Sequence, residues 1–490
     1  MESVIVFGTG GLFKSFHKYI CEIYDLKLLL DNDYSKHGCF FNETEIIKPD
    51  ISLCSRNERI IVASFFFDEI KEQLANLGVC RDRIFNIADE KPLLDMVYSD
   101  MKYNSNTSRV KNQIEAIAPS LKRDILFIVN SMVMGGSELS LLNTLKMIDY
   151  SKNRVVLIVI NGGGVLTSLI PDKVIIIEIF KTQNECAIQQ CLFRYVSSEM
   201  LYKNFVDKYF DVVVAYTMGS AAKLACEIPA HRKIMWIHSD LSVSHPTKHN
   251  FTSIDDEAAC YKKFNEIVFV SKSSRKGFNL LFENVNVKKI VMGNLFDVDE
   301  ITNKSALDDI STPSSYFKKK DAINFIFVGR LSEEKGIIRL LNAFERALKF
   351  NYNIKLMIVG HGNLFSAVQT FILERNMDDH VFLVGQCENP YPYMRAADVL
   401  ILPSYYEGQP LVIGEAFILG LPVIATSSDS CKEMLCDGEF GLLVENSEDG
   451  IFNGLCRAMS EDNFISVFKI KSRRGIASLR TDFNDDFFIH

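Results

Sequence analysis

A chain of 490 residues is too long for one ordinary hydrophobic core, so we expect two or three domains. Apolar residues make up 48% and charged residues 24% of the chain, which excludes a disordered or fibrous protein. The net charge of -8 at pH 7 argues against nucleic acid as the main partner, because phosphate backbones require a basic surface.

The 12 cysteines are scattered without a CxxC pair, and the chain opens on the strand-like VIVFG rather than on a signal peptide. This usage indicates reduced thiols rather than a disulfide framework or a zinc site. No apolar run approaches the ~20 residues that a membrane-spanning helix requires. We therefore expect a cytoplasmic protein, with peripheral contact to the inner face of the cell membrane left open.

The first stretch begins with VIVFGTGG, a strand that runs into a glycine-rich turn at Gly8, Gly10 and Gly11. A second strand, LKLLLD, ends at Asp31, at about the distance from which a Rossmann fold holds a ribose hydroxyl. The turn lacks the full GxGxxG, so an ordinary turn and nucleotide binding remain equal alternatives. We assign residues 1–98 to a Rossmann-like, nucleotide-binding-like module and leave its ligand open.

Residues 99–122 are polar and predict a linker with one helix. Beyond them, apolar strands alternate with helices in two further stretches, which predicts parallel sheets covered on both faces. We expect an N-terminal (acceptor) domain over residues 123–296 and a C-terminal (donor) domain over 297–460. Between such domains lies a cleft at the carboxyl ends of their strands, where open α/β sheets bind ligands.

The tail over residues 461–490 contains FKIKSRRGIASLR, which carries five cations in 13 residues. This pattern suits either a solvated helix face or contact with anionic lipid. Crossing back to brace the first of the two large domains is a further option for this tail.

The strongest chemical signal is VGRLSEEKG, which places Arg330 at the end of a strand and Lys335 at the entry of the next helix. Two cations on a strand-to-helix loop suit a diphosphate, with arginine as a fork and lysine as a point charge. Taken alone, the pair is also typical of a solvated surface loop.

A second signal is YYEGQPLVIGEAF, in which Glu407 follows the strand DVLILP. Gly408 and Pro410 then shape the turn into a helix that contains Glu415, and the amino end of that helix offers free amides to a phosphate. Carboxylates spaced in this way suit two hydroxyl-bearing parts of one ligand, a sugar and a ribose. They do not suit a glycosidase pair, whose carboxyl groups face one bond.

These elements resemble the C-terminal half of a GT-B glycosyltransferase of the large retaining family 4. The resemblance lies in GR-L-x-x-x-KG, the VG-H-G turn at Gly360 to Gly362, the FLVG strand, AADVLILPS and E-x7-E, and it covers residues 123 to 460. It implies an α/β fold of GT-B type, with two Rossmann-like parallel-sheet domains facing a cleft, plus the small N-terminal Rossmann-like domain. QCENPYPYMRAADVLILPSYYEGQP is similar to members that act in bacterial cell-surface glycan synthesis.

The resemblance implies that Arg330 and Lys335 neutralise the donor diphosphate. Glu407 would contact sugar hydroxyls and Glu415 would accept the ribose hydroxyls, while the amides of the turn between them cradle sugar and phosphate. The base would lie near Gly385 to Glu388. The catalytic residues so predicted are Glu407, His238, Arg330 and Lys335. The donor-binding residues so predicted are Arg330, Lys335, Gly408, Gln409, Pro410, Leu411, Glu415, Gly385, Gly135 and Gly136.

In the acceptor domain, Gly135 and Gly136 match the family's glycine loop near donor phosphate and acceptor, although an ordinary strand-to-helix turn would look the same. His238, in WIHSDL, matches a histidine near the reacting sugar, with a merely packed histidine as the alternative. Asn294 matches the crossing between the domains. Glu138 either orients the acceptor or the loop, or serves as an N-terminal helix charge.

The D-x-D triplets at Asp31 to Asp33 and Asp297 to Asp299 belong to the extra domain and the hinge, so we expect neither to hold a metal at the donor. No metal and no other cofactor are expected, because cations and helix amides supply the positive charge. The sequence thus predicts a retaining, metal-independent hexosyltransferase in bacterial cell-surface polysaccharide synthesis (capsule, O-antigen or teichoic-type). Its donor would be a nucleotide diphosphate sugar, with UDP the family's commonest nucleotide, and its acceptor a glycan, a lipid-linked sugar or a polymer. The alternatives are a GT-B sugar-nucleotide epimerase and a non-catalytic nucleotide-sugar-binding protein.

Overall fold

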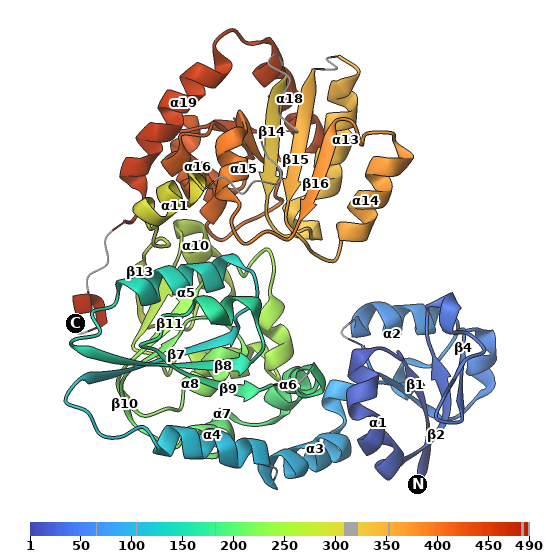
Figure 1. Cartoon of the computed structure of the whole chain (residues 1–490). Helices are drawn as coiled ribbons and strands as arrows, with labels where there is room; N and C mark the ends of the chain where they lie inside the picture. Colours follow the sequence, from blue (N-terminus) through green and yellow to red (C-terminus); the bar gives the residue numbers. More distant parts are fainter. Residues whose placement is uncertain are drawn as a thin grey trace.

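Three predominantly parallel sheets follow one another along the chain, each with its own helices (Figure 1). The α/β class and the Rossmann-like repetition expected from the sequence are confirmed. Among the described residues, none of the helices combines the length and apolar character needed to cross a membrane. The computed structural model describes residues 1–64, 66–103, 105–181, 183–307, 322–350, 353–481 and 485–488.

The first sheet has the strand order β3-β4-β2-β1-β5-β6, and only the β3–β4 pair is antiparallel. Its apolar strands are buried from both sides, as their continuous hydrophobic runs require. Its elements are β1 (Glu2–Phe7), α1 (Gly11–Ile23), β2 (Tyr24–Leu30), β3 (Phe40–Phe41), β4 (Thr44–Ile47), β5 (Arg59–Val62), α2 (Phe67–Asn76) and β6 (Ile84–Asn86).

Two helices, α3 (Lys91–Tyr103) and α4 (Ser105–Glu115), occupy much of the segment expected to be a linker with one helix. They run from the first sheet along the second (Figure 1). Leu94 and Val97 of α3, and Val110 and Ile114 of α4, are fully buried in the core shared with both sheets. Apolar residues at helical spacing therefore hold a largely polar segment in place, and the structure differs here from a free linker.

The second sheet has seven parallel strands in the order β13-β12-β11-β10-β7-β8-β9. Its strands are β7 (Arg123–Ser131), β8 (Asn153–Asn161), β9 (Ile175–Phe180), β10 (Phe210–Ala215), β11 (Ala230–Ile237), β12 (Glu266–Phe269) and β13 (Lys288–Val291). The helices are α5 (Gly136–Met147), α6 (Gln183–Tyr195), α7 (Ser198–Phe205), α8 (Ser220–Ala225), α9 (Ile254–Tyr261) and α10 (Lys272–Leu281), and α11 (Val298–Ser305) leads to the next domain.

The third sheet has six parallel strands in the order β16-β15-β14-β17-β18-β19. Its strands are β14 (Ile323–Val328), β15 (Ile354–Val359), β16 (Val381–Gly385), β17 (Val399–Leu402), β18 (Val423–Thr426) and β19 (Leu442–Val444). The helices are α13 (Ile337–Leu348), α14 (Phe365–Glu374), α15 (Tyr391–Ala396), α16 (Leu411–Leu419), α17 (Asp429–Met434), α18 (Glu448–Ser460) and α19 (Phe464–Arg474).

The end of the chain returns from the third sheet to the second, where Figure 1 places the C-terminus. The backbone amide of Phe296 donates to the carbonyl of Arg480 at 3.0 Å. Further on, the ring of Phe488 packs edge-on against Phe127 and that of Phe487 against Trp236. The tail therefore joins the two large domains. Residues 482–484 and 489–490 of the expected tail lie outside the described residues.

Candidate functional site

The candidate site lies where loops at the carboxyl ends of strands in the second and third sheets meet. The loop after β7 carries Gly135 and the residue after β11 is His238, while the loop after β14 carries Arg330 and the loop after β17 carries Gly408. Gly135 lies beside Arg330, and Gly408 lies beside His238. This is the position at which open α/β sheets bind their ligands.

Arg330 extends from the third sheet over the glycine turn that starts α5. A methyl group on Gly135 would lie 3.1 Å from Nη2 of Arg330 and would collide with the carboxylate of Glu138. Only a glycine leaves room for both the guanidinium and the carboxylate on this side of the turn. The structure therefore brings the predicted glycine loop and the predicted diphosphate-binding arginine together across the domain boundary.

Lys335 and Glu407, predicted to bind different parts of the donor, are bonded to each other in the structure. Nζ of Lys335 donates to both carboxylate oxygens of Glu407, at 2.6 and 2.7 Å. The hydroxyl of Ser404 donates to one of the same oxygens at 2.7 Å. The lysine side chain is 23% exposed and the glutamate side chain 9%. The pair thus joins the loops after β14 and β17 within a partly buried setting.

The turn that follows Glu407 packs directly on the second domain. A side chain on Gly408 would overlap the carbonyl of His238, so this backbone approach requires glycine. The side-chain oxygen of Gln409 accepts a 2.5 Å bond from the amide of Asn294. Leu411 then begins α16, whose amino end has no side-chain cap. The amide of Ile413 donates to the carbonyl of Pro410, while those of Leu411 and Val412 have no bonding partner among the described residues and could face an anion.

Glu415 lies within α16, buried and 3.2 Å from the hydroxyl of Tyr391, which donates to it. Burial raises the pKa of the Glu415 carboxyl to about 7, and the bond from Tyr391 opposes that rise only in part. The residue predicted to hold the ribose is therefore close to its titration point near neutral pH. The sequence alone did not assign a function to Tyr391, although it lies in the aromatic stretch PYPYM.

His238 follows β11 and packs with its ring 5.1 Å from that of Tyr216. Burial lowers the pKa of His238 to about 4, although a bond to the backbone of Tyr216 acts in the opposite direction. The ring is therefore neutral at physiological pH. Its Nε2 is buried and has no hydrogen-bond partner among the described residues. A neutral ring with an unpaired nitrogen is suited to accept a bond from a ligand hydroxyl.

Gly385, predicted near the base of the nucleotide, ends β16 at the same edge of the third sheet. Its carbonyl accepts the amide of Gly360 at 2.8 Å, and the neighbouring ring of His361 stacks on Phe365. The carbonyl of His361 accepts the amide of Leu331, one residue after Arg330. The loops after β14, β15 and β16 therefore form one continuous rim.

A second contact between the two large domains lies beside the site and was absent from the sequence analysis. The carboxylate of Glu433, on α17, accepts the backbone amide of Lys272 at 2.9 and 3.2 Å. That amide belongs to the first residue of α10, so a carboxylate of the third-sheet domain caps a helix of the second-sheet domain. Lys276 and Asp429 add a 3.4 Å ion pair between the same two helices.

The D-x-D triplets are engaged in local structure. Burial works against the ionised form of Asp31, but bonds from Thr9, the amide of Asp33 and Lys36 lower its pKa to about 2. Asp297 caps α11 by accepting the amide of Glu300 at 2.8 Å. The Asp31 carboxylate, considered for a ribose hydroxyl, is thus already surrounded by donors of its own domain.

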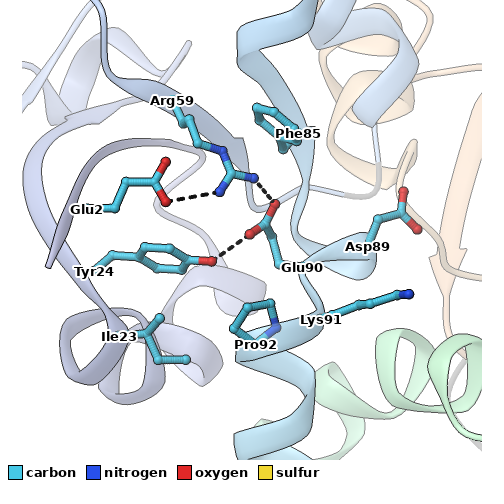
Figure 2. Close-up of a pocket in the computed structure, with 9 residues that line it drawn as sticks. All are labelled: Glu2, Ile23, Tyr24, Arg59, Phe85, Asp89, Glu90, Lys91 and Pro92. Carbon is cyan, nitrogen blue, oxygen red and sulfur yellow. Dashed lines mark hydrogen bonds and ion pairs between the residues drawn. The ribbon is translucent and has the colours of Figure 1, made fainter.

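A shallow hollow of about 480 Å³ lies at the opposite, amino-terminal edge of the first sheet (Figure 2). Arg59 donates there to Glu90 at 2.6 Å, and the hydroxyl of Tyr24 donates to the same carboxylate at 2.6 Å. The guanidinium also lies 3.8 Å from the ring centre of Phe85. Because Glu90 directly precedes α3, this network fastens the start of that helix to the sheet.

Comparisons with known proteins agree with this architecture. Residues 309–474 match the family described as Glycosyl transferases group 1. An uncharacterized glycosyltransferase of Methanocaldococcus jannaschii is 30% identical over 177 residues, which are 36% of this chain and 43% of that protein. The Campylobacter jejuni N-acetylgalactosamine-N,N'-diacetylbacillosaminyl-diphospho-undecaprenol 4-alpha-N-acetylgalactosaminyltransferase is 28% identical over 231 residues, 46% of this chain and 60% of that enzyme. The chain thus spans less than two thirds of the length of either relative.

Among solved structures, the complex of Anabaena Alr3699/HepE with UDP and glucose superimposes with a TM-score of 0.58. The sequence identity is 18%, and the overlap takes in 73% of this chain and 96% of that one. At this identity the likeness concerns the fold. The two larger domains have the GT-B architecture of glycosyltransferases.

Proposed function

We propose that this protein is a retaining glycosyltransferase that moves a sugar from a nucleotide diphosphate sugar to an acceptor hydroxyl. The observation that carries the proposal is the meeting of Arg330 and the Gly135–Gly136 turn with the Lys335–Glu407 pair and the amino end of α16. Two cations and free amides gathered at one domain boundary suit a diphosphate.

The Lys335–Glu407 bond defines what a donor would have to change. An incoming diphosphate would share the ammonium group of Lys335 with Glu407. The Glu407 carboxylate would then accept bonds from sugar hydroxyls in place of part of its bonding to the lysine. The bond from Ser404 would keep that carboxylate oriented during the exchange. We assign the ribose to Glu415, which would take its hydroxyls best in the ionised form.

His238 would contact the transferred sugar. Its neutral ring and unpaired Nε2 support a hydroxyl of that sugar as the bonding partner, and its lowered pKa argues against a role as proton donor. Its backbone carbonyl also packs against Gly408, so the position of the histidine depends on the position of the loop after β17.

In the reaction, the bond from the anomeric carbon to the β-phosphate oxygen breaks and a bond to the acceptor oxygen forms. The acceptor proton passes to the departing diphosphate on the same face of the sugar, which yields retention. Arg330, Lys335 and the helix amides would stabilise the charge that develops on the leaving group, without a metal ion. Closure of the domains would exclude water and limit hydrolysis.

We further propose UDP as the nucleotide and a bacterial cell-surface glycan, lipid-linked sugar or polymer as the acceptor. The Campylobacter relative, named for a diphospho-undecaprenol acceptor, supports this class. A lipid-linked acceptor would bring the protein to a membrane surface.

The test is a panel of nucleotide sugars screened for a rise in melting temperature, followed by transfer assays with the stabilising donor. A donor at 100 times its Kd adds about 2.7 kcal/mol to stability, enough for a clear shift. We expect slow donor hydrolysis without acceptor, with release of the nucleoside diphosphate. Release of an isomerised sugar would favour an epimerase, and binding without any turnover would favour a non-catalytic binding protein.

A further inference from the structure

Glu138 is a buried carboxylate that the proposed reaction leaves without a role. Only 7% of the residue is exposed, although it lies in the first turn of α5 beside the cleft. Its side chain accepts a 2.8 Å bond from the hydroxyl of Ser137. Burial raises the pKa of the Glu138 carboxyl, while that bond and the positive charge of Arg330 act in the opposite direction.

The carboxylate and the guanidinium of Arg330 both lie against Gly135, on the side where a side chain would project. Arg330 comes from the other domain and is exposed, and no hydrogen bond or ion pair holds its guanidinium within the described part of the chain. An exposed arginine without a partner samples many rotamers, and ordering it costs entropy when a ligand binds.

We propose that Glu138 is a positioning residue that draws Arg330 over the Gly135–Gly136 turn and so prepares the guanidinium for the donor diphosphate. The inference rests on the proposed function. Because the Glu138 carboxylate is buried and Arg330 is exposed, an incoming phosphate would meet the guanidinium before it met the carboxylate. The attraction then acts before the donor arrives, and less rotamer freedom remains to be lost on binding.

Two other roles for Glu138 predict different outcomes. If the Glu138 carboxylate only interacts with the dipole of α5, its removal should lower the stability of the protein. The size of that loss should be the same whether or not Arg330 is present. A carboxylate close to the bound diphosphate would repel it, so that its removal would tighten binding.

The experiment measures UDP binding by calorimetry for the wild type, Glu138→Gln, Arg330→Ala and the double variant. Asp256→Asn is the matched control, because Asp256 occupies the same first-turn position in α9 of the same domain. We expect Glu138→Gln to weaken UDP binding by about tenfold, because a factor of ten corresponds to about 1.4 kcal/mol and ordering one long side chain costs up to about that much. In the Arg330→Ala background the same change should have little effect, because the group it positions is gone.

Two further variants distinguish the positioning role of Glu138 from the other two roles. Glu138→Asp, which keeps the charge, should recover part of the lost affinity, whereas Asp256→Asn should leave UDP binding unchanged. An equal loss on Glu138→Gln in both backgrounds, or a gain in affinity, overturns the positioning role while the proposed function stands. A wild-type protein that binds no nucleoside diphosphate overturns both.

Discussion

Replacing Lys335 by methionine should separate the stability of the site from its chemistry. Nζ of Lys335 bonds Glu407 at 2.6 Å, and the glutamate is 9% exposed, so the change leaves a nearly buried carboxylate with one hydroxyl donor, Ser404. Removing one partner of a buried pair costs about 3–5 kcal/mol. The 23% exposure of the lysine and the remaining bond reduce this to about 2 kcal/mol.

For a domain of this size a loss of about 2 kcal/mol lowers the melting temperature by roughly 4–8 °C. Lys203→Met is the control, because its pair with Glu199 has the same 2.6 Å length but side chains that are 62% and 65% exposed. It should change stability by less than about 0.5 kcal/mol. The turnover of Lys335→Met should fall by about 10²-fold or more, as loss of one preorganised charge contact to a leaving group predicts.

The double variant of Lys335→Met with Glu407→Gln sharpens the experiment. It removes the stranded charge, so it should regain much of the lost stability while remaining inactive. Differential scanning calorimetry and a donor-hydrolysis assay give both readouts. A single variant of normal stability, or one with near-normal turnover, would refute the assignment of this pair to the donor site.

Three other substitutions probe different parts of the site. Because the pKa of Glu415 is about 7 in the free protein, donor affinity should rise as the pH increases through 7, and Glu415→Gln should abolish that step in calorimetric titrations. The folded state holds this proton more tightly than the unfolded chain, so the contribution of Glu415 to stability is full below pH 4.5 and declines toward pH 7. Gly408→Ala should force the donor loop off His238, which small-angle scattering would detect as a more open particle together with a loss of turnover. Glu433→Gln should weaken the contact between its side chain and the amide of Lys272 and so raise the KM for the donor about two- to fivefold. High salt should raise the KM of the wild type in the same way, and an unchanged KM in the variant would contradict this prediction.

The sequence predicted the type of each sheet and the loops that carry Arg330, Lys335 and Glu407, because glycines and charges at strand ends have local causes. It did not predict that Lys335 and Glu407 bond to each other, since this contact joins loops 72 positions apart. The approach of Gly408 to His238 is likewise long-range. It depends on how two separately folded sheets are placed, which local spacing does not encode.

Other differences had local signals. Val110 and Ile114 have helical spacing, yet the polar composition around them favoured a linker over residues 99–122. The apolar run IIVASFFF over residues 60–67 suits one buried strand by its composition, but β5 ends at Val62 and α2 begins at Phe67. Between them the hydroxyl of Ser64 accepts the amide of Phe66, a serine turn that interrupts the apolar run.

The contacts that join the two large domains beside the site differ from the polar groups there that have no bonding partner among the described residues. Beside the site, the backbone approach at Gly408 and the bond between Gln409 and Asn294 join the domains through uncharged groups, while the charged contacts of Lys276 and Glu433 lie between α10 and α17. Arg330 and Nε2 of His238, by contrast, reach the same boundary without a bonding partner in the described residues. A donor that filled this boundary would have no interdomain ion pair to displace at Arg330, and the proposed attraction by Glu138 would leave less of its binding energy needed to order the guanidinium. On the proposed function, the exchange at Lys335, where an existing bond must be shared, would be the step that discriminates a diphosphate from a weaker anion.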